Sequence, residues 1–378
     1  MDKIKLKRGE YIDSEGHVRR RSEKYYQRVR QMRIRYSIAG GIFVTILIAL
    51  ICIIAGKGKE AKAQTDEVET ILPATTLVMA AEPTEPTPTP VEEKVPKVNE
   101  NEHPDMFYEG YQVFKDKDTR EVTNEEVISS FCILVDLKDG HVVAQRNAFE
   151  RMYPASMTKV LTILVAAEHM QDPEDTFTMT QEITDYVFSH GCSQVGYSVG
   201  ETMTVKELLF GTIMPSGGDA AMALAYYTAG SMEAFVDMMN EKLVELGLDG
   251  VAHFTNPVGV YDDQNYCTPA AMAMIMKAAL ENDLCREALG QKKYTTAPTD
   301  YHPEGMIISN WFLRRIEDKD THGEVLGAKT GFVNESRNCA VSYERSNDGN
   351  QYICVTGDAH SAWRAIYDHV AIYDDFVK

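Results

Sequence analysis

The sequence lacks the residue patterns of proteins that are stabilised by metals or by disulfides. Its 378 residues contain only 7 Cys and 10 His. No two cysteines are spaced C-x-x-C, which argues against a zinc ribbon, and no two histidines form an H-E-x-x-H pair, which argues against a zincin. The cysteines are also too sparse for a disulfide scaffold. We therefore expect no metal ion and no other cofactor.

Charge is missing from one stretch, residues 37–56, which reads SIAGGIFVTILIALICIIAG. Its length matches the roughly 20 residues that a helix needs to cross a bilayer. Residues 1–36 before it hold 12 Lys and Arg against 5 Asp and Glu. Because basic residues flank the cytoplasmic side of a membrane span, the sequence predicts a cytoplasmic tail at 1–36, a single transmembrane helix at 37–56 and an extracellular remainder.

A cleaved signal peptide is the alternative, because Ala61-Lys62-Ala63 resembles a small-residue cleavage site. The apolar run is long for a signal peptide, which favours a retained anchor. Residues 57–105 are predicted to be a linker. Their segment EPTEPTPTP cannot pack a core and favours extended polyproline II.

Positive charge is scarce after the predicted anchor. Residues 57–378 hold 26 Lys and Arg against 52 Asp and Glu. Such a surface repels phosphate groups, so nucleic acid is not expected as a partner.

The two ends of the remaining segment, residues 106–378, have the pattern of β-hairpins. Residues 131–136 and 141–145 are apolar runs around an Asp-Gly turn, and residues 338–344 and 351–356 repeat this arrangement. Residues 360–377 suit a helix that packs on the resulting sheet. We expect one antiparallel sheet built from both chain ends.

The middle of this segment is predicted to be helical. Apolar residues recur at helical spacing over 156–169. A Thr-x-x-Glu capping pair opens a helix over 204–213, a serine opens one over 231–247, and Thr-Pro opens one over 268–280. The fold class is therefore α/β (α+β), with helices flanking the sheet and forming a helical subdomain.

A Ser-x-x-Lys motif lies at the start of the first of these helices. Ser156 and Lys159 follow Pro154 and lie one turn apart on the same face. A neutral lysine amine at this position can act as general base for the serine hydroxyl. The helix N-terminus favours the negative charge that develops during such a reaction.

Two further motifs follow along the chain. Ser216 lies in a Gly-rich loop between two predicted helices, where its hydroxyl could relay a proton to a leaving amine. Lys329-Thr330-Gly331 lies next to a predicted strand. A lysine and a threonine hydroxyl at a strand edge can bind a carboxylate, and the glycine allows another backbone to approach closely.

In their order and surroundings these motifs resemble those of the penicillin-recognising serine acyl-enzymes, and specifically the low-molecular-mass D-alanyl-D-alanine carboxypeptidases. The similarity covers about residues 125–375. Four segments carry it: Tyr153–Thr162, Met214–Ala221, Phe254–Gly259 and Gly327–Phe332. It implies that residues 106–378 form a single catalytic domain with the β-lactamase/transpeptidase-like fold.

The resemblance also implies residue roles. Ser156 would be the nucleophile, Lys159 its base, and Ser216 the group that passes the proton to the departing D-alanine. Substrate would be bound by Lys329, Thr330, Gly331 and Phe332. The first two would hold the terminal carboxylate, and the backbone N–H groups of Ser156 and Phe332 would form an oxyanion hole.

The sequence departs from the family at Gly218, where the second motif normally ends in Asn. The missing carboxamide would have bonded the substrate and helped to hold the lysine. In the same region, the resemblance makes Asn256 a residue that fixes its loop rather than a catalyst. It also brings Cys192 and Cys267 near the cleft, as two buried thiols or, alternatively, as a disulfide.

The implied function is that of a bacterial membrane-anchored serine carboxypeptidase that removes D-alanine from peptidoglycan stem peptides and is acylated by β-lactams. A serine β-lactamase is an alternative, although Asn256-Pro257 stands where its Glu-x-x-x-Asn element would be expected. A non-catalytic or weakly active protein that binds the wall or penicillin is another alternative, suggested by Gly218.

Overall fold

A computed structural model describes residues 10–12, 18–20 and 107–377. Near the N-terminus, the chain forms two short strands, β1 (Glu10–Ile12) and β2 (Val18–Arg20), which pair antiparallel. The predicted transmembrane helix at 37–56 and the predicted linker at 57–105 lie outside the described residues. Among the residues that are described, no helix has the length and apolar character needed to cross a membrane.

One six-stranded sheet, in the order β10-β11-β12-β4-β5-β3, joins the two ends of the 107–377 segment. The strands are β3 (Arg120–Glu121), β4 (Phe131–Asp136), β5 (Val142–Arg146), β10 (Gly323–Val333), β11 (Arg337–Ser346) and β12 (Gln351–Ala359). Both predicted hairpins are confirmed, and β12 from the C-terminal hairpin pairs antiparallel with β4 from the N-terminal one. The predicted antiparallel sheet is present and differs at one edge, where the short β3 runs parallel to β5.

The helices lie between these strands in sequence, except for the last one, which follows β12; both placements were predicted. They are η2, a 3-10 helix (Ala155–Met157), α2 (Thr158–His169), α3 (Gln181–Ser189), α4 (Val205–Ile213), α5 (Gly218–Ala229), α6 (Met232–Glu245), α7 (Pro269–Glu281), α8 (Asp283–Gly290), α9 (Leu313–Ile316) and α10 (Ala362–Phe376). The predicted caps are present: Thr204 and Glu207 form a reciprocal capping box, and Ser231 and Thr268 each accept a hydrogen bond from the first turn of their helix. The remaining strands form two small antiparallel pairs, β6 (Thr176–Thr178) with β7 (Thr202–Thr204) and β8 (Lys293–Thr295) with β9 (Ile307–Ser309).

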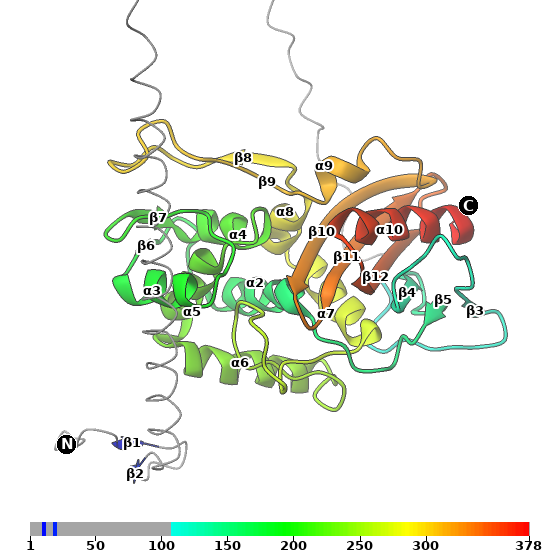
Figure 1. The fold of residues 1–378 in the computed structure, drawn as a ribbon, viewed down its shortest axis with the longest axis horizontal. Helices are drawn as coiled ribbons and strands as arrows, with labels where there is room; N and C mark the ends of the chain where they lie inside the picture. The colour runs from blue at the N-terminus through cyan, green and yellow to red at the C-terminus, as the bar shows by residue number, and fades with distance from the viewer. Residues whose placement is uncertain (1–9, 13–17, 21–106, 378) are drawn as a thin grey trace, which may run out of the picture. The chain divides into compact units, whose positions relative to one another are not determined.

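Helices cover both faces of the sheet (Figure 1). The residues of strand β4 alternate between two cores, so both faces of the sheet need cover. Ile133 and Val135 belong to the core beneath α7, whereas Cys132 and Leu134 belong to the core beneath α10. A strand buried on both faces reads as a continuous apolar run, which is the pattern of FCILVD. Strand β10 is the sheet edge nearest the helical subdomain (α2 to α6 and α8), while β3 is the far edge.

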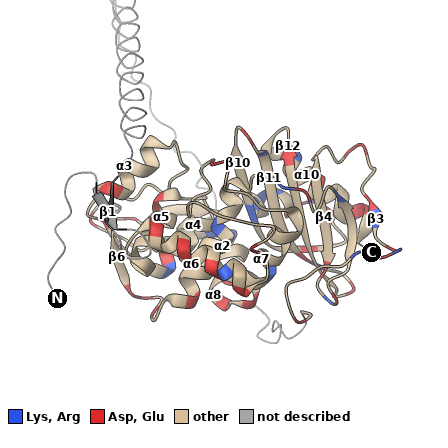
Figure 2. Cartoon of the chain, turned by 90° about the horizontal axis from the view of Figure 1, so that it is seen from below, with Lys and Arg blue, Asp and Glu red and all other residues tan. Residues whose placement is uncertain are grey.

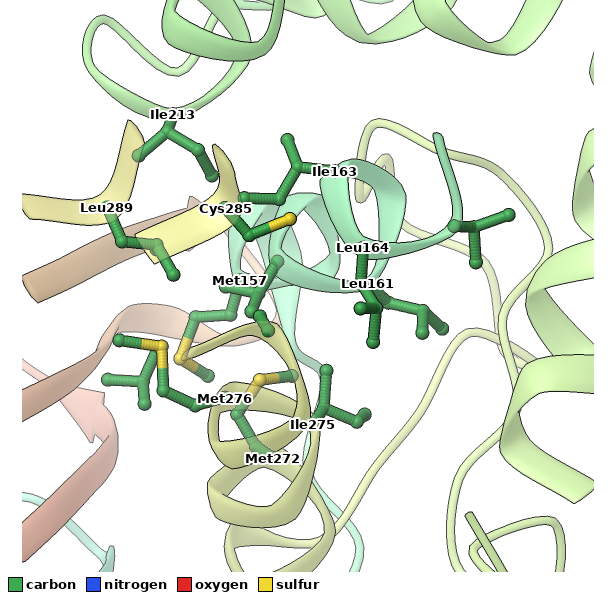
Figure 3. Packing of buried hydrophobic residues seen from close by; sticks show 14 of the residues in the cluster. Met157, Leu161, Ile163, Leu164, Ile213, Met272, Ile275, Met276, Cys285 and Leu289 are labelled. Carbon is green, nitrogen blue, oxygen red and sulfur yellow. The ribbon is translucent and has the colours of Figure 1, made fainter. Parts of the chain in front are cut away.

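Helix α2 lies at the centre of the larger core. Its side chains pack with those of α7 and α8 (Figure 3). Met272, Met274 and Met276 of α7 are each at most 1% exposed, so this methionine run belongs to the core. Close packing of this kind fixes the direction in which every α2 side chain points, including the lysine of the first motif.

All six cysteines in the described part of the chain are free. Five are buried, as expected for small apolar side chains, and Cys192 is half-buried. The alternative of a disulfide between Cys192 and Cys267 is therefore wrong. Charged residues are spread over the fold: Figure 2 shows Asp and Glu on the helical subdomain as well as on the sheet and its loops.

Candidate active site

A cleft of about 320 Å³ lies where the edge strand β10 meets η2 and the loops of the helical subdomain. Its lining includes Ser156, Lys159, Ser216 and Thr330. These residues come from three segments that are far apart in sequence. The structure therefore brings the three predicted motifs to one place.

Ser156 and Lys159 are joined directly. Ser156 lies in the η2 turn and Lys159 in the first turn of α2, and the Lys159 Nζ donates to the Ser156 Oγ over 3.0 Å. The same Nζ donates to the carbonyl oxygen of Val258 over 2.7 Å. Lys159 is 1% exposed, and this burial lowers its pKa to about 8, because the charged ammonium loses its hydration. A neutral amine is thus available near the serine at mildly alkaline pH.

Asn256 explains why the Val258 carbonyl points at this lysine. The Asn256 Oδ1 accepts hydrogen bonds from the backbone N–H groups of Val258, Gly259 and Val260, and its Nδ2 donates to the Val260 carbonyl. The side chain is 5% exposed and closes the loop on itself. The expectation that Asn256 fixes a loop agrees with this geometry.

We predict that Asn256→Ala weakens both the fold and the site. The loss of a buried side chain with several hydrogen bonds should lower the free energy of unfolding by about 1–3 kcal/mol. The rate of acylation should fall as well, because the loop that orients Lys159 loosens. Urea unfolding and acylation by fluorescent penicillin measure the two effects. Asn347→Ala, at an exposed turn residue, is the control, and equal behaviour of the two variants would contradict the prediction.

Ser216 occupies the turn between α4 and α5 with a φ of 63°, in the left-handed region that few residues other than glycine adopt. The Lys329 Nζ on β10 donates to its Oγ over 2.9 Å and to the Thr330 carbonyl over 2.6 Å. Burial lowers the pKa of Lys329 well below its usual value, and the nearby Lys159 lowers it further. Strained backbone and a buried amine with a lowered pKa are features that occur together at functional sites.

Two glycines let the walls of the cleft approach each other. A Cβ atom at Gly331 would lie 2.7 Å from the Cys339 Sγ, 2.8 Å from the Pro154 carbonyl oxygen and 3.0 Å from the Ser156 nitrogen. At Gly259, which has a φ of 86°, it would lie 1.9 Å from the Ala155 carbonyl oxygen. The predicted close approach at the Lys-Thr-Gly strand is thus present. Phe332, which follows Gly331 in β10, is 58% exposed and lines the cleft.

Sequence reasoning missed several groups that line the cleft. These groups are Trp311, Asn338 and the loop residues His190, Gly191 and Ser193. None of them belongs to a motif, and only the folded chain brings them to the cleft. No group of three or more His, Cys, Asp or Glu that could hold a metal ion occurs in the part of the chain that the structure describes.

The arrangement can support acyl transfer. It offers a hydroxyl beside a buried amine, a second hydroxyl held by another lysine, and a narrow gap between backbone segments at the serine nitrogen. A nucleophile that is hydrogen-bonded to its base, with a second hydroxyl in the same cleft, is suited to a covalent acyl-enzyme route.

Comparisons with known proteins agree with this chemistry. The family model of Peptidase S11, described as D-alanyl-D-alanine carboxypeptidase, matches residues 118–361. The D-alanyl-D-alanine carboxypeptidase DacF of Bacillus subtilis is 31% identical over 241 residues, which are 64% of this chain and 59% of the Bacillus protein. A D-alanyl-D-alanine carboxypeptidase of Streptomyces strain K15 is 31% identical over 215 residues, 53% of this chain and 71% of that protein.

A solved structure shows the same fold. The crystal structure of the Streptomyces K15 DD-transpeptidase superposes with a TM-score of 0.61 at 26% identity, covering 67% of this chain and 98% of that one. The family match, the shared fold and the three motifs gathered in one cleft lead to one conclusion. The chain belongs to the Peptidase S11 family of D-alanyl-D-alanine carboxypeptidases.

Proposed function

We propose that this protein is a serine D-alanyl-D-alanine carboxypeptidase that trims peptidoglycan stem peptides through an acyl-enzyme on Ser156. The observation that carries the proposal is the 3.0 Å hydrogen bond between the buried Lys159 Nζ and the Ser156 Oγ, in a cleft that also holds the Ser216–Lys329 pair. Membership of the family supplies the substrate class, a peptide that ends in D-Ala-D-Ala.

Acylation would begin when the neutral Lys159 amine takes the proton of Ser156. The Ser156 Oγ then bonds to the carbonyl carbon of the penultimate D-alanine. The backbone N–H groups of Ser156 and Phe332 would stabilise the oxyanion, a contribution of about 3–4 kcal/mol per donor. The C–N bond breaks as the leaving amine receives a proton through Ser216. Water then hydrolyses the ester and releases the shortened peptide.

The Lys-Thr-Gly strand would bind the terminal carboxylate of the substrate. Thr330 and Phe332 line the cleft, and the Lys329 ammonium lies behind Ser216. Charge-assisted hydrogen bonds to a carboxylate are stronger than neutral ones. The same contacts would accept the carboxylate of a β-lactam, whose strained amide would acylate Ser156.

The proposal places the catalytic domain, residues 106–378, outside a bacterial cell membrane. The sequence supports this placement: the basic tail at 1–36 would lie in the cytoplasm, the span at 37–56 would anchor the chain, and the linker at 57–105 would reach toward the wall. Cleavage after Ala63 would instead release the domain.

The test is D-alanine release by the full chain in detergent micelles. A peptide ending in D-Ala-D-Ala should lose one D-alanine, and prior treatment with penicillin should block the reaction. A peptide ending in D-Ala-L-Ala is the matched control. Penicillin labelling without D-alanine release would overturn the proposal in favour of a penicillin-binding protein without turnover, the second candidate, which the glycine at position 218 favours.

A further inference from the structure

Gly218 is the position at which the chain departs from its family, and packing explains the glycine. The residue begins α5 in helical backbone, which other residues adopt as well. A Cβ atom there, however, would lie 2.9 Å from the Cys192 Cβ, 3.2 Å from the Val258 Cγ1 and 3.3 Å from the Ser193 carbonyl oxygen. The side chain of Cys192 therefore takes the space into which a residue at position 218 would extend.

Backbone contacts hold Cys192 in this place. The Gly218 N–H donates to the Ser193 carbonyl over 2.7 Å. The Asp219 carboxylate, 2% exposed, accepts hydrogen bonds from the N–H groups of Val195 and Gly196, each over 2.9 Å. The first turn of α5 thus fixes the loop that follows α3, and Cys192 has little freedom to move away from Gly218.

Cys192 also lies close to the catalytic lysine. Both residues line the cleft. The Lys159 Nζ donates to the carbonyl of Val258, whose side chain closes around position 218 together with Cys192. Of the six free cysteines in the described part of the chain, Cys192 is the one that is not fully buried. Cys192 is therefore a half-buried side chain in the wall of the cleft that also contains Lys159.

We propose that Cys192 is a positioning residue that replaces the missing third residue of the second motif, by packing beside Lys159 and keeping water away from its amine. The inference rests on the proposed function, because Lys159 matters in this way only as a base. A thiol suits the task, since it behaves as a small apolar group with weak hydrogen-bonding capacity.

The first test changes residue 218 alone and then residues 218 and 192 together. It measures the second-order rate constant of acylation by fluorescent penicillin. Gly218→Asn alone should lower this constant by about tenfold or more, because the new side chain collides with Cys192. Combining it with Cys192→Gly should recover most of the loss. Gly250→Asn, where no atom lies within 4 Å of a Cβ, is the matched control and should stay within about twofold of the wild type.

The second test is the pH profile of acylation. Cys192→Gly should move the acid limb to higher pH, because water that enters the space stabilises the Lys159 ammonium. The thiol adds no charge of its own there, since burial raises its pKa. Cys192→Ser keeps the volume and should move the limb less. A merely structural role would lower the rate equally at every pH.

Three results would overturn the inference: Gly218→Asn acylated as fast as the wild type, a double variant no faster than Gly218→Asn, or an unchanged acid limb in Cys192→Gly. If neither the wild type nor Gly250→Asn is acylated, the proposed function fails instead. Thermal unfolding then still tests the contact, because Gly218→Asn should lower the Tm when Cys192 is present and not when it is glycine. Additive shifts in Tm would refute it.

Discussion

Replacing Ser156 by alanine is expected to reduce D-alanine release by about 10⁴-fold or more and to abolish covalent penicillin labelling. The variant keeps the cleft, so substrate can still bind, but no acyl-enzyme can form. The structure supports a large effect because the Ser156 Oγ accepts a hydrogen bond from the buried Lys159 Nζ over 3.0 Å. The measurement is kcat/KM with a D-Ala-D-Ala peptide, alongside gel fluorescence after labelling.

The control for this variant is Ser189→Ala, because Ser189 is an exposed serine at the end of α3. It should retain wild-type activity and labelling. The Tm of Ser156→Ala should stay close to that of the wild type, since its hydroxyl is half-buried and its neighbours remain packed. Residual labelling of a folded Ser156→Ala protein would show that another residue is the nucleophile.

The second large effect is expected for Lys159→Met, which removes the amine but retains most of the apolar volume. A general base contributes about 10²–10⁴-fold to a rate, so the acylation constant should fall by that factor. Lys159→Arg should not restore it, because a guanidinium remains protonated in proteins. Activity of Lys159→Arg near the wild-type level would mean that positive charge, rather than a neutral amine, is what the site requires.

The pH dependence of the wild type follows from the same group. Burial lowers the pKa of Lys159 to about 8. Above that pH the amine is neutral and can accept the Ser156 proton, and below it the ammonium cannot. The acylation rate should therefore rise through about pH 8 and level off at higher pH. A profile that is flat from pH 6 to 9 would contradict the assignment of Lys159 as base.

Local sequence patterns predicted the elements of the domain well. Residues such as Thr204 and Thr268 cap their helices through contacts within one turn, so the sequence alone reveals them. The Ser156–Lys159 pair is likewise a product of helical spacing. The six strands were predicted less completely. Strand β3 is a two-residue edge strand without an apolar pattern, and Lys329-Thr330-Gly331, which was expected to precede a strand, lies within β10.

The groups that complete the cleft depend on tertiary packing, which no spacing rule encodes. The Val258 carbonyl reaches Lys159 from a loop about a hundred positions later in the chain, and its direction depends on hydrogen bonds to Asn256. Cys192 meets Gly218 because its loop is held by hydrogen bonds to Asp219 and to the Gly218 N–H. In the sequence, Gly218 departs from the second motif. The structure shows the Cys192 side chain in the space that a side chain at position 218 would occupy.

The most direct test of the account is to identify the residue that penicillin acylates in the full chain. After labelling, tryptic digestion and mass spectrometry should locate a single adduct on the peptide Met152–Lys159, at Ser156. Fragment ions that assign the adduct to Ser156 would support the acyl-enzyme at the centre of this mechanism. An adduct on any other residue, or a folded protein that forms none, would contradict it.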